Sequence, residues 1–455
     1  MMRTLFYFAK FINDIRRSDV VHEGVPSLSQ TTVLLAAAMS PPKLQTSAKY
    51  AARCDAKFPL EQTLVDSLVQ YQQRDRVYNM SQMFGRVSLL YNESVPCFRK
   101  QPCSAAEKRA DPLACAWMGA HRTCAFAQII KNKVKVRVRQ TADSSDQEFK
   151  TFFNVDRLQA WVAEIQEVAS RVALPDSQFF IFLGDGCPVE FWDRLGSEGP
   201  LPPILCAEMQ KKDAMNRQFT PFFAPPRSMF KSWGWDENLK TIANKDRSRW
   251  ADKIPKAVFR GASTGMDDST PDWRKATRPA LAMLSRDHPD LIDAGLTSIV
   301  QIQKNSTLEE IRAFGLATYM SMEEQANHKI IIVPDGNTAA DRLPSHMLHN
   351  VAIAKPSSEH TEFWYDEIKP WVHYIPSKSD LSDFVENIKT ALSNDTRLRG
   401  IAVDSSKFVK NKLTRGRLNC YWYRLLRELG ELQGKSGSKV VFMEEESTCS
   451  APFGV

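Results

Sequence analysis

The chain has 455 residues, of which 43% are hydrophobic and 25% are charged. This length is typical of about two or three domains, each able to bury its own core, and this composition is typical of a globular protein. The net charge of +7 suits a ligand that carries phosphate, although an ordinary surface can have the same balance. No apolar stretch reaches the ~18 residues that a membrane helix needs, and no run of arginines and aromatics predicts a nucleic-acid partner.

The N-terminal part of the chain has little pattern. Residues 1–55 are rich in Ser, Thr and Pro, so we predict an extension with little fixed structure. Neither a clear signal peptide nor an ER-retention signal is visible. The spacing of a cysteine cluster, without any CxxC pair, favours disulfides over a zinc site: Cys97, Cys103, Cys115 and Cys124. Four sequons are compatible with a secretory compartment: Asn79, Asn92, Asn305 and Asn394.

Helical and strand periodicities alternate from residue 58 onwards. A helix is predicted over 58–73, a half-exposed strand over 124–139 and a helix over 156–172, which leads into a buried apolar strand over 179–183. Residues 187–250 then read as Pro-rich loops, whose aromatic side chains could equally stack on sugars or pack in a core.

The second half of the chain alternates short apolar strands with amphipathic helices. Strands are predicted over 256–259, 299–303, 328–333 and 351–354, and helices over 273–285, 308–316, 381–392, 405–413 and 418–432. This alternation predicts an α/β fold with a parallel sheet covered by helices on both faces.

The turn after the strand over 328–333 carries the residues most suited to binding. Pro334-Asp335-Gly336-Asn337-Thr338 ends the strand, and Ala339 begins a helical pattern whose first N–H groups would face a ligand. Gly336, Asn337 and Ala339 would let the main chain approach a nucleotide closely. The sequence therefore predicts a phosphate-binding turn.

Three arginines lie at or near strand ends. Arg260 ends one strand, in the sequence Arg260-Gly261-Ala262-Ser263-Thr264, Arg278 lies in the helix after it, and Arg342 follows the turn just described. Each could direct two N–H donors at diphosphate oxygens, although a single arginine is more often a surface ion-pair partner.

Asp185 follows the strand over 179–183 and is flanked by Gly184 and Gly186. Its carboxylate could point from the sheet edge into a cleft at little steric cost. On local sequence alone, a turn aspartate that caps its own backbone is the more frequent alternative.

Two ordered motifs carry a resemblance to a known family. DGNTAADRLP at 335–344 and KPWVHYIPSKSDLSD at 369–383, followed by an amphipathic helix, closely resemble CAP10-type glycosyltransferases, glycosyltransferase family 90, which includes protein O-glucosyltransferases and capsule xylosyltransferases. The resemblance covers about residues 179–432.

The resemblance implies a GT-B-like fold, in which two Rossmann-like domains face each other across a cleft and a C-terminal helix crosses back. The domains expected are an extension over 1–55, an acceptor-side α/β domain over 56–255, a nucleotide-sugar-binding domain over 256–415, and a crossover helix and tail over 416–455.

The function implied is an inverting transfer of glucose or xylose from a UDP-sugar to a hydroxyl acceptor on a protein or glycan, in the ER or Golgi lumen. Asp185 would be the general base. The resemblance assigns the nucleotide sugar to the following residues, with Glu362 accepting hydrogen bonds from the ribose: Arg260, Gly261, Ser263, Thr264, Arg278, Asp335, Gly336, Asn337, Ala339, Arg342 and Glu362. Asp341 departs from the aromatic or small residue that many relatives have there.

No metal or other cofactor is expected, because no Asp-x-Asp pair follows a predicted strand; Asp267-Asp268 lacks that spacing. The main alternative is a non-catalytic carbohydrate-binding or scaffold protein that keeps the fold. A nucleotide-dependent oxidoreductase ranks lower, because no GxGxxG follows any predicted strand.

Overall fold

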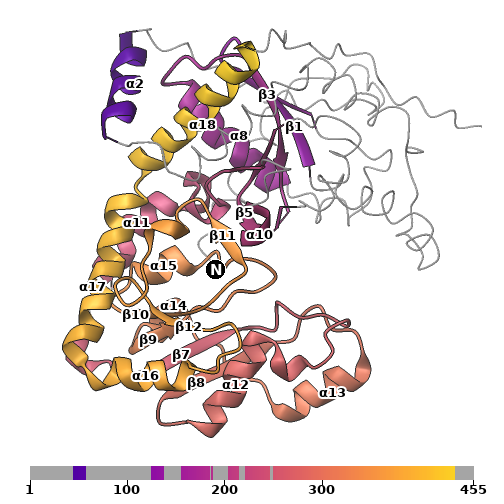
Figure 1. Cartoon of the computed structure of the whole chain (residues 1–455), viewed down its shortest axis with the longest axis vertical. Helices are drawn as coiled ribbons and strands as arrows, with labels where there is room; N and C mark the ends of the chain where they lie inside the picture. Colours follow the sequence, from indigo (N-terminus) through magenta and orange to yellow (C-terminus); the bar gives the residue numbers. More distant parts are fainter. Residues whose placement is uncertain are drawn as a thin grey trace, which may run out of the picture. The chain divides into compact units, whose positions relative to one another are not determined.

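The computed structural model describes residues 45–57, 124–137, 155–184, 186–187, 203–214, 221–245 and 249–435 (Figure 1). They all belong to one compact unit, Ser40–Val455. The predicted helix over 58–73 and three cysteines of the cluster, Cys97, Cys103 and Cys115, lie outside the described residues. The predicted extension is partly ordered, because α2 (Gln45–Lys57) is a helix of thirteen residues.

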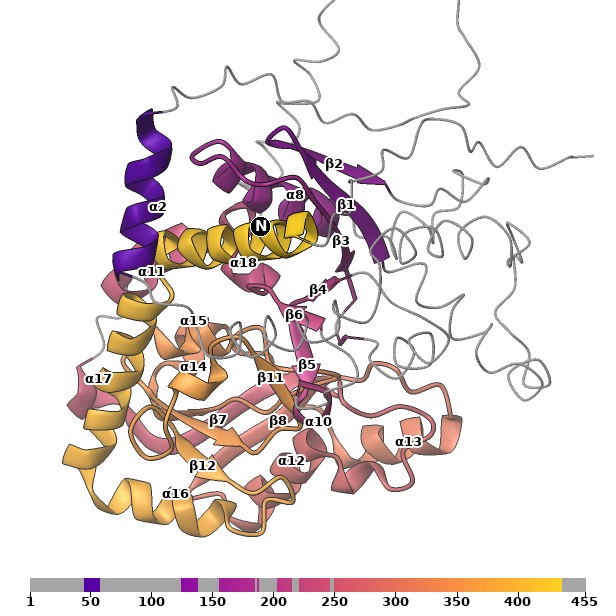
Figure 2. The same cartoon turned by 45° about the horizontal axis from the view of Figure 1, so that its top comes forward.

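The first sheet has the strand order β2-β1-β3-β4-β6 (Figure 2). Its strands are β1 (Cys124–Ile130), β2 (Lys133–Arg137), β3 (Ser177–Phe182), β4 (Ile204–Cys206) and β6 (Pro221–Phe223). β3, β4 and β6 are parallel, whereas β1 pairs antiparallel with both β2 and β3. Helix α8 (Val155–Ala169) precedes β3, as predicted.

The prediction of one strand over 124–139 is wrong. Lys131 and Asn132 have positive φ angles of 47° and 65° and form a two-residue turn, which folds the segment into the antiparallel pair β1 and β2. A tight two-residue hairpin turn needs positive φ angles at both of its central residues, and asparagine adopts such angles readily.

Residues 187–250 are more regular than the predicted loops. Among the described residues they contain β4, β5 (Glu208–Gln210), α10 (Lys211–Ala214), β6, three short 3₁₀ turns (Arg227–Met229, Lys231–Trp233, Trp250–Asp252) and helix α11 (Trp235–Lys245). Among the described aromatic side chains of this segment Trp233 is 47% exposed, and five are buried: Phe222, Phe223, Phe230, Trp235 and Trp250. Core packing is therefore the main role of these rings.

The second sheet is entirely parallel, in the order β12-β10-β9-β7-β8. Its strands are β7 (Ile254–Ala262), β8 (Ile292–Ser298), β9 (His328–Ile332), β10 (Ala352–Pro356) and β12 (Ile375–Ser377). The predicted α/β class and parallel pairing are thus confirmed. The order reverses between β7 and β9, and in open parallel sheets such a switch point is where ligands bind, beyond the carboxyl ends of the strands.

Helices flank this sheet, as the alternation predicted. They are α12 (Thr277–Asp287), α13 (Asn305–Phe314), α14 (Met322–Gln325), α15 (Leu343–Met347), α16 (Phe384–Ser393) and α17 (Asp395–Lys412). Alternate strand residues enter two separate cores: Ile331 packs in the cluster that contains Leu343 of α15, and Ile330 in the cluster that contains Phe384 of α16. Both faces of the sheet are therefore buried.

The strand predicted over 299–303 is wrong, because β8 ends at Ser298. Asp293 and Gly295 interrupt the apolar pattern of β8, so its sequence does not contain the apolar run that predicts a buried strand. Gly295 is required there, since a Cβ atom would lie 2.4 Å from the Ala317 side chain.

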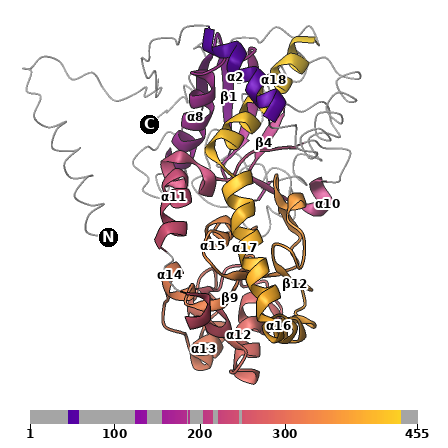
Figure 3. The same cartoon turned by 90° about the vertical axis from the view of Figure 1, so that its left-hand side faces the viewer.

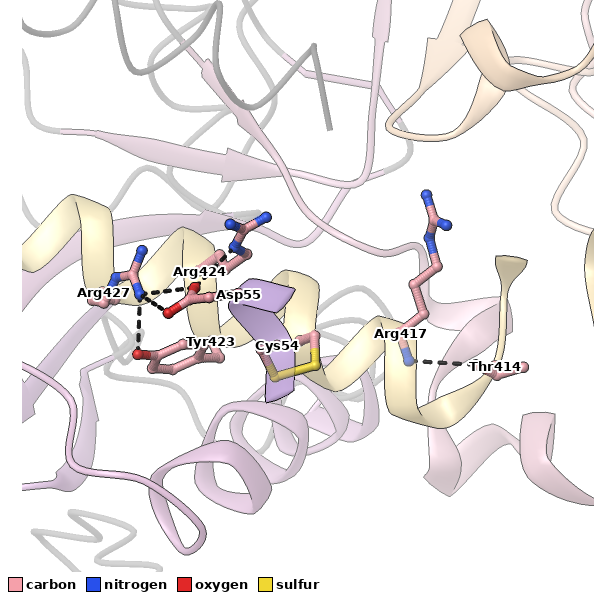
Figure 4. Close-up of a disulfide and its surroundings, with 8 residues drawn as sticks. Cys54, Asp55, Thr414, Arg417, Tyr423, Arg424 and Arg427 are labelled. Atoms are coloured by element: carbon pink, nitrogen blue, oxygen red, sulfur yellow. Dashed lines mark hydrogen bonds and ion pairs between the residues drawn. A yellow bond between two sulfur atoms is a disulfide. The ribbon is translucent and has the colours of Figure 1, made fainter. Parts of the chain in front are cut away.

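The last helix, α18 (Arg415–Lys435), follows α17 (Figure 3) and packs against the first sheet. Gln433 Oε1 accepts the Gln178 N–H at 2.9 Å, and Gln433 Nε2 donates to the Gln178 oxygen at 2.8 Å. A disulfide joins Cys420 of α18 to Cys54 of α2, and Asp55 beside it pairs with Arg424 and Arg427 (Figure 4). These contacts agree with the predicted packing of the last helix on the first part of the chain.

None of the helices in the described part of the chain combines the length and the hydropathy that a membrane crossing requires.

Candidate active site

A cavity of about 300 Å³ lies beyond the carboxyl ends of β7 and β9, at the switch point of the second sheet. Helix α8 and the segments around β3, β5 and β6 contribute one part of its wall: Arg157, Trp161, Phe182, Leu183, Gly184, Ala207, Glu208, Pro226 and Arg227. Helix α12 and the segments after β7 and β9 contribute the other part: Thr264, Arg278 and residues 336–342. This volume is at the lower end of those typical of small-molecule sites.

The turns after β7 and β9 are in close contact. A Cβ atom on Gly336 would lie 2.7 Å from Thr264 Oγ1 and 2.9 Å from Arg278 Nη2, so a side chain at position 336 would collide with both. The Gly265 N–H donates to Asn337 Oδ1 at 3.0 Å, and Gly265 has a φ of 95° that favours glycine. The glycines therefore let the two turns join to form one edge of the cavity.

The helix predicted to begin at Ala339 is wrong. Residues 336–339 form bends, residues 341–342 form a turn, and α15 begins only at Leu343 and has five residues. Pro344 at the start of α15 fits the first turn of a helix, where no N–H is needed. A helix N-terminus therefore does not supply the donors expected there, and the cavity depends on side-chain cations instead.

Arg278 is buried, with 8% of its surface exposed. Its Nε donates to the main-chain oxygen of Asp335 at 2.9 Å, and its Nη1 donates to the oxygen of Ala262 at 3.0 Å. Burial, and then the neighbouring Arg342, lower the pKa of Arg278 to about 9. The charged guanidinium is thus short of compensating negative charge.

Arg342 lies beside Arg278, and both guanidinium groups stack on the ring of Phe259, at 5.5 Å and 5.8 Å from its centre. Arg342 Nη2 is buried and has no hydrogen-bond partner among the described residues. Gly261 makes room for it, because a Cβ atom there would lie 3.1 Å from Nη2. Burial lowers the pKa of Arg342 as well. Two neighbouring cations thus line the cavity, and one has an unused donor.

Arg260 does not join this pair. Its Nη2 forms an ion pair with Asp293 Oδ1 at 2.7 Å, and its Nε donates to the Thr318 oxygen at 3.1 Å. Arg260 is not among the residues that line the cavity. The expectation that three arginines meet at one site therefore needs correction, because the structure brings together only Arg278 and Arg342.

Four other predicted residues lie behind the cavity wall rather than on it: Gly261, Ser263, Asp335 and Glu362. The Ser263 hydroxyl accepts the Val300 N–H at 2.9 Å and anchors the loop after β8. Asp335 Oδ1 faces Lys355 Nζ at 3.7 Å, and Asp335 holds Arg278 through its main-chain oxygen. These residues support the turn, and Thr264, Gly336, Asn337 and Ala339 line the cavity as predicted.

Glu362 is 1% exposed and accepts the Trp364 Nε1–H at 2.7 Å. It lies on β11 (His360–Glu362), which pairs antiparallel with β5 so that Glu362 is opposite Glu208. Burial raises the pKa of Glu362 to about 8. The structure thus places this carboxyl group inside the wall, and its predicted contact with a ribose stays a prediction.

Three charged residues on the wall were missed by the sequence predictions: Glu208, Arg227 and Arg157. Arg227 Nε donates to Asp341 Oδ2 at 3.1 Å, and Arg157 Nη1 donates to the Leu183 oxygen at 2.7 Å. The departure at Asp341 was a signal only for its partner Arg227. Glu208 lies on β5, whose three residues show no periodicity.

Asp185, the predicted general base, lies outside the described residues. The residues on either side are described: Gly184 lines the cavity, and a Cβ atom on Gly186 would lie 3.2 Å from Thr338 Cγ2. A disulfide ties Cys187 to Cys206 at the end of β4.

In the described residues no group of three His, Cys, Asp or Glu side chains is arranged to hold a metal ion.

A family model described as glycosyl transferase family 90 matches residues 120–447 of the chain. The chain is 31% identical to protein O-glucosyltransferase 3 of Rattus norvegicus over 268 residues, which is 58% of this chain and 49% of the relative. It is 30% identical to the Homo sapiens protein of the same name over 285 residues, 61% of this chain and 52% of that one. Protein O-glucosyltransferase 2 of Danio rerio is 30% identical over 274 residues, 60% of this chain and 50% of that one. The chain spans about half the length of these curated relatives.

Proposed function

Since the chain belongs to glycosyl transferase family 90, we propose that it transfers a sugar from a nucleoside diphosphate sugar to a hydroxyl acceptor, with the diphosphate held by Arg278 and Arg342. The donor we propose is UDP-glucose or UDP-xylose. The uridine and the choice of sugar rest on the motif resemblance described above.

The observation that supports this proposal best is the uncompensated charge of the arginine pair. Two neighbouring guanidinium groups line the cavity, and Arg342 Nη2 has no hydrogen-bond partner among the described residues. Two nearby carboxylates already face other cations, since Asp341 pairs with Arg227 and Asp335 with Lys355. A diphosphate would supply the missing negative charge and accept the unused N–H donor.

The same pair would serve the reaction itself. Negative charge develops on the diphosphate as its bond to the anomeric carbon breaks, and fixed cations in a water-poor cavity stabilise that charge. In the inverting reaction that we propose, Asp185 removes the acceptor hydroxyl proton while the acceptor oxygen attacks from the face opposite the leaving group. Inversion and the role of Asp185 rest on the family resemblance.

The acceptor we propose is a serine or threonine hydroxyl of a protein, because several similar proteins are named protein O-glucosyltransferases. A glycan hydroxyl is the alternative. We also propose a secretory compartment, since the disulfides Cys54–Cys420 and Cys187–Cys206 need an oxidising environment to persist.

Calorimetry with purified protein tests the diphosphate site. We expect UDP to bind at least about tenfold more tightly than UMP, because UMP lacks the phosphate that would reach both arginines. Hydrolysis of UDP-glucose and UDP-xylose, measured as UDP release, tests the chemistry. Equal affinity for UMP and UDP would contradict the assignment of the arginine pair.

A non-catalytic protein that keeps the fold is the second candidate. It would bind a UDP-sugar without releasing UDP, in the presence or absence of acceptor peptides. Binding together with UDP release by the wild-type protein, and no release by Asp185→Asn, would exclude that alternative.

A further inference from the structure

We propose that Glu208 is a specificity-determining residue, whose carboxyl group recognises a hydroxyl group of the transferred sugar. This inference rests on the proposed function, and it adds a residue that lies in none of the motifs that carry the family resemblance.

The environment of Glu208 supports this role. Only 7% of its surface is exposed, yet it lines the cavity, and its Oε2 has no hydrogen-bond partner among the described residues. A buried polar atom without a partner costs free energy, so native proteins seldom retain one without a reason. A ligand hydroxyl group would satisfy this atom.

The position of Glu208 relative to the arginine pair also supports this role. The turn after β9 runs along the cavity, with Gly336 against Arg278 at one end and Thr338 against the Gly186 turn at the other. Glu208 lies at the second end, where its carboxyl group is close to the Thr338 side chain and the Ala339 main chain. A sugar attached to a diphosphate at the first end would extend along this turn and reach Glu208.

The electrostatic environment of Glu208 is compatible with a diphosphate nearby. β5 and β11 hold Glu208 opposite Glu362, and both carboxyl groups are buried. Burial, and then the Glu362 charge, raise the pKa of Glu208 to about 9. A neutral carboxyl group does not repel a diphosphate, and it can both donate and accept a hydrogen bond, which suits a sugar hydroxyl.

The experiment compares the affinities of UDP and UDP-glucose, with UDP-xylose as a second probe, by calorimetry. Glu208→Ala removes the carboxyl group, Glu208→Gln keeps a neutral donor and acceptor, and Gln210→Ala is the matched control on β5, away from the cavity. We expect Glu208→Ala to bind UDP within about twofold of the wild type and to lose about five- to tenfold in affinity for the UDP-sugar. Glu208→Gln and Gln210→Ala should retain both affinities.

Two results would overturn the inference. Equal losses for UDP and UDP-sugar in Glu208→Ala would mean that the residue only supports the turn, and unchanged UDP-sugar affinity would mean that it does not contact the sugar. If the wild-type protein bound neither UDP nor a UDP-sugar, the proposed function itself would fail. If the wild-type protein bound UDP, and Glu208→Ala kept the wild-type ratio of UDP-sugar affinity to UDP affinity, only the role of Glu208 would be contradicted.

Discussion

Arg278 Nε donates to the main-chain oxygen of Asp335 at 2.9 Å and so joins the helix after β7 to the turn after β9. The bond crosses the switch point of the second sheet, where the strand order reverses. Arg278 therefore has two tasks, because it fixes the turn that shapes the cavity and also places a cation in its wall. Arg342, beside it, donates a long bond from Nη1 to the Arg260 oxygen at 3.5 Å, and its Nη2 has no hydrogen-bond partner within the described part of the chain.

This difference predicts different results for the two arginines. Arg342→Ala should weaken UDP binding by about 1.5 to 3 kcal/mol, the usual contribution of a charged hydrogen bond, without lowering the melting temperature. Arg342→Lys should recover only part of that loss, because lysine cannot offer two donors in one plane. Calorimetry and thermal unfolding are the measurements.

Arg278→Ala should weaken UDP binding and also lower stability, because it removes bonds to the oxygens of Asp335 and Ala262. Arg274→Ala is the matched control, since that arginine is half-exposed and bonded to Glu310 away from the cavity. If Arg278→Ala and Arg342→Ala both left the UDP affinity unchanged, the pair would have a purely structural role.

Asp185→Asn should keep the fold and the nucleotide affinity, since the two side chains have the same shape and the proposed role is confined to proton removal. Transfer should fall by about 10²-fold or more in kcat. The exposed Asp290→Asn is a suitable control. Wild-type turnover by the Asp185 variant would assign the base elsewhere.

The sequence indicated the apolar strands well, because residues such as Ile330, Ile331 and Ile332 can fill only a strand that is buried on both faces. It could not indicate β5, because a strand of three residues shows no periodicity. The sequence therefore did not indicate Glu208, whose Oε2 has no hydrogen-bond partner among the described residues. Glu208 is brought to the site by pairing with β11, more than a hundred residues later in the chain.

Arg260 and Arg342 illustrate the same limit. Both follow apolar patterns that end near the switch point, and nothing local distinguishes them. The neighbouring strand β8 determines where the Arg260 guanidinium lies, because Asp293 Oδ1 on β8 forms an ion pair with Arg260 Nη2 at 2.7 Å. Arg342 has no carboxylate partner in the described ion pairs and remains directed to the cavity.

Metal removal should leave activity unchanged. In many sugar-nucleotide enzymes a divalent ion compensates the leaving diphosphate, and here we assign that task to Arg278 and Arg342. We therefore expect transfer in excess EDTA to match the untreated rate. A loss that manganese or magnesium restores would contradict both the metal independence and the arginine assignment.

The disulfide Cys54–Cys420 should contribute to stability without affecting nucleotide binding, because neither α2 nor α18 lines the cavity. It closes a loop of 366 residues, so the double variant Cys54→Ala/Cys420→Ala should lose about 2 to 5 kcal/mol of unfolding free energy in denaturant titrations. Asp55→Asn, which removes only the ion pairs beside the disulfide, should lose less than about 1 kcal/mol. Equal losses would mean that the ion pairs, not the disulfide, hold α2.

The buried carboxyl pair predicts how stability depends on pH. The pKa of Glu362 is raised from 4.5 to about 8, mainly by burial and further by Asp341 and Asp335, so the folded protein keeps a proton that the unfolded chain has lost. Unfolding free energy should therefore fall as pH rises from about 5 to 8, with a slope of up to about 1.4 kcal/mol per pH unit for one proton. Glu362→Gln cannot ionise, so its slope should be smaller and its stability at pH 8 should exceed that of the wild type. Urea titrations at pH 5, 6, 7 and 8 measure this, and parallel profiles for the two proteins would show that Glu362 is ionised in the folded state.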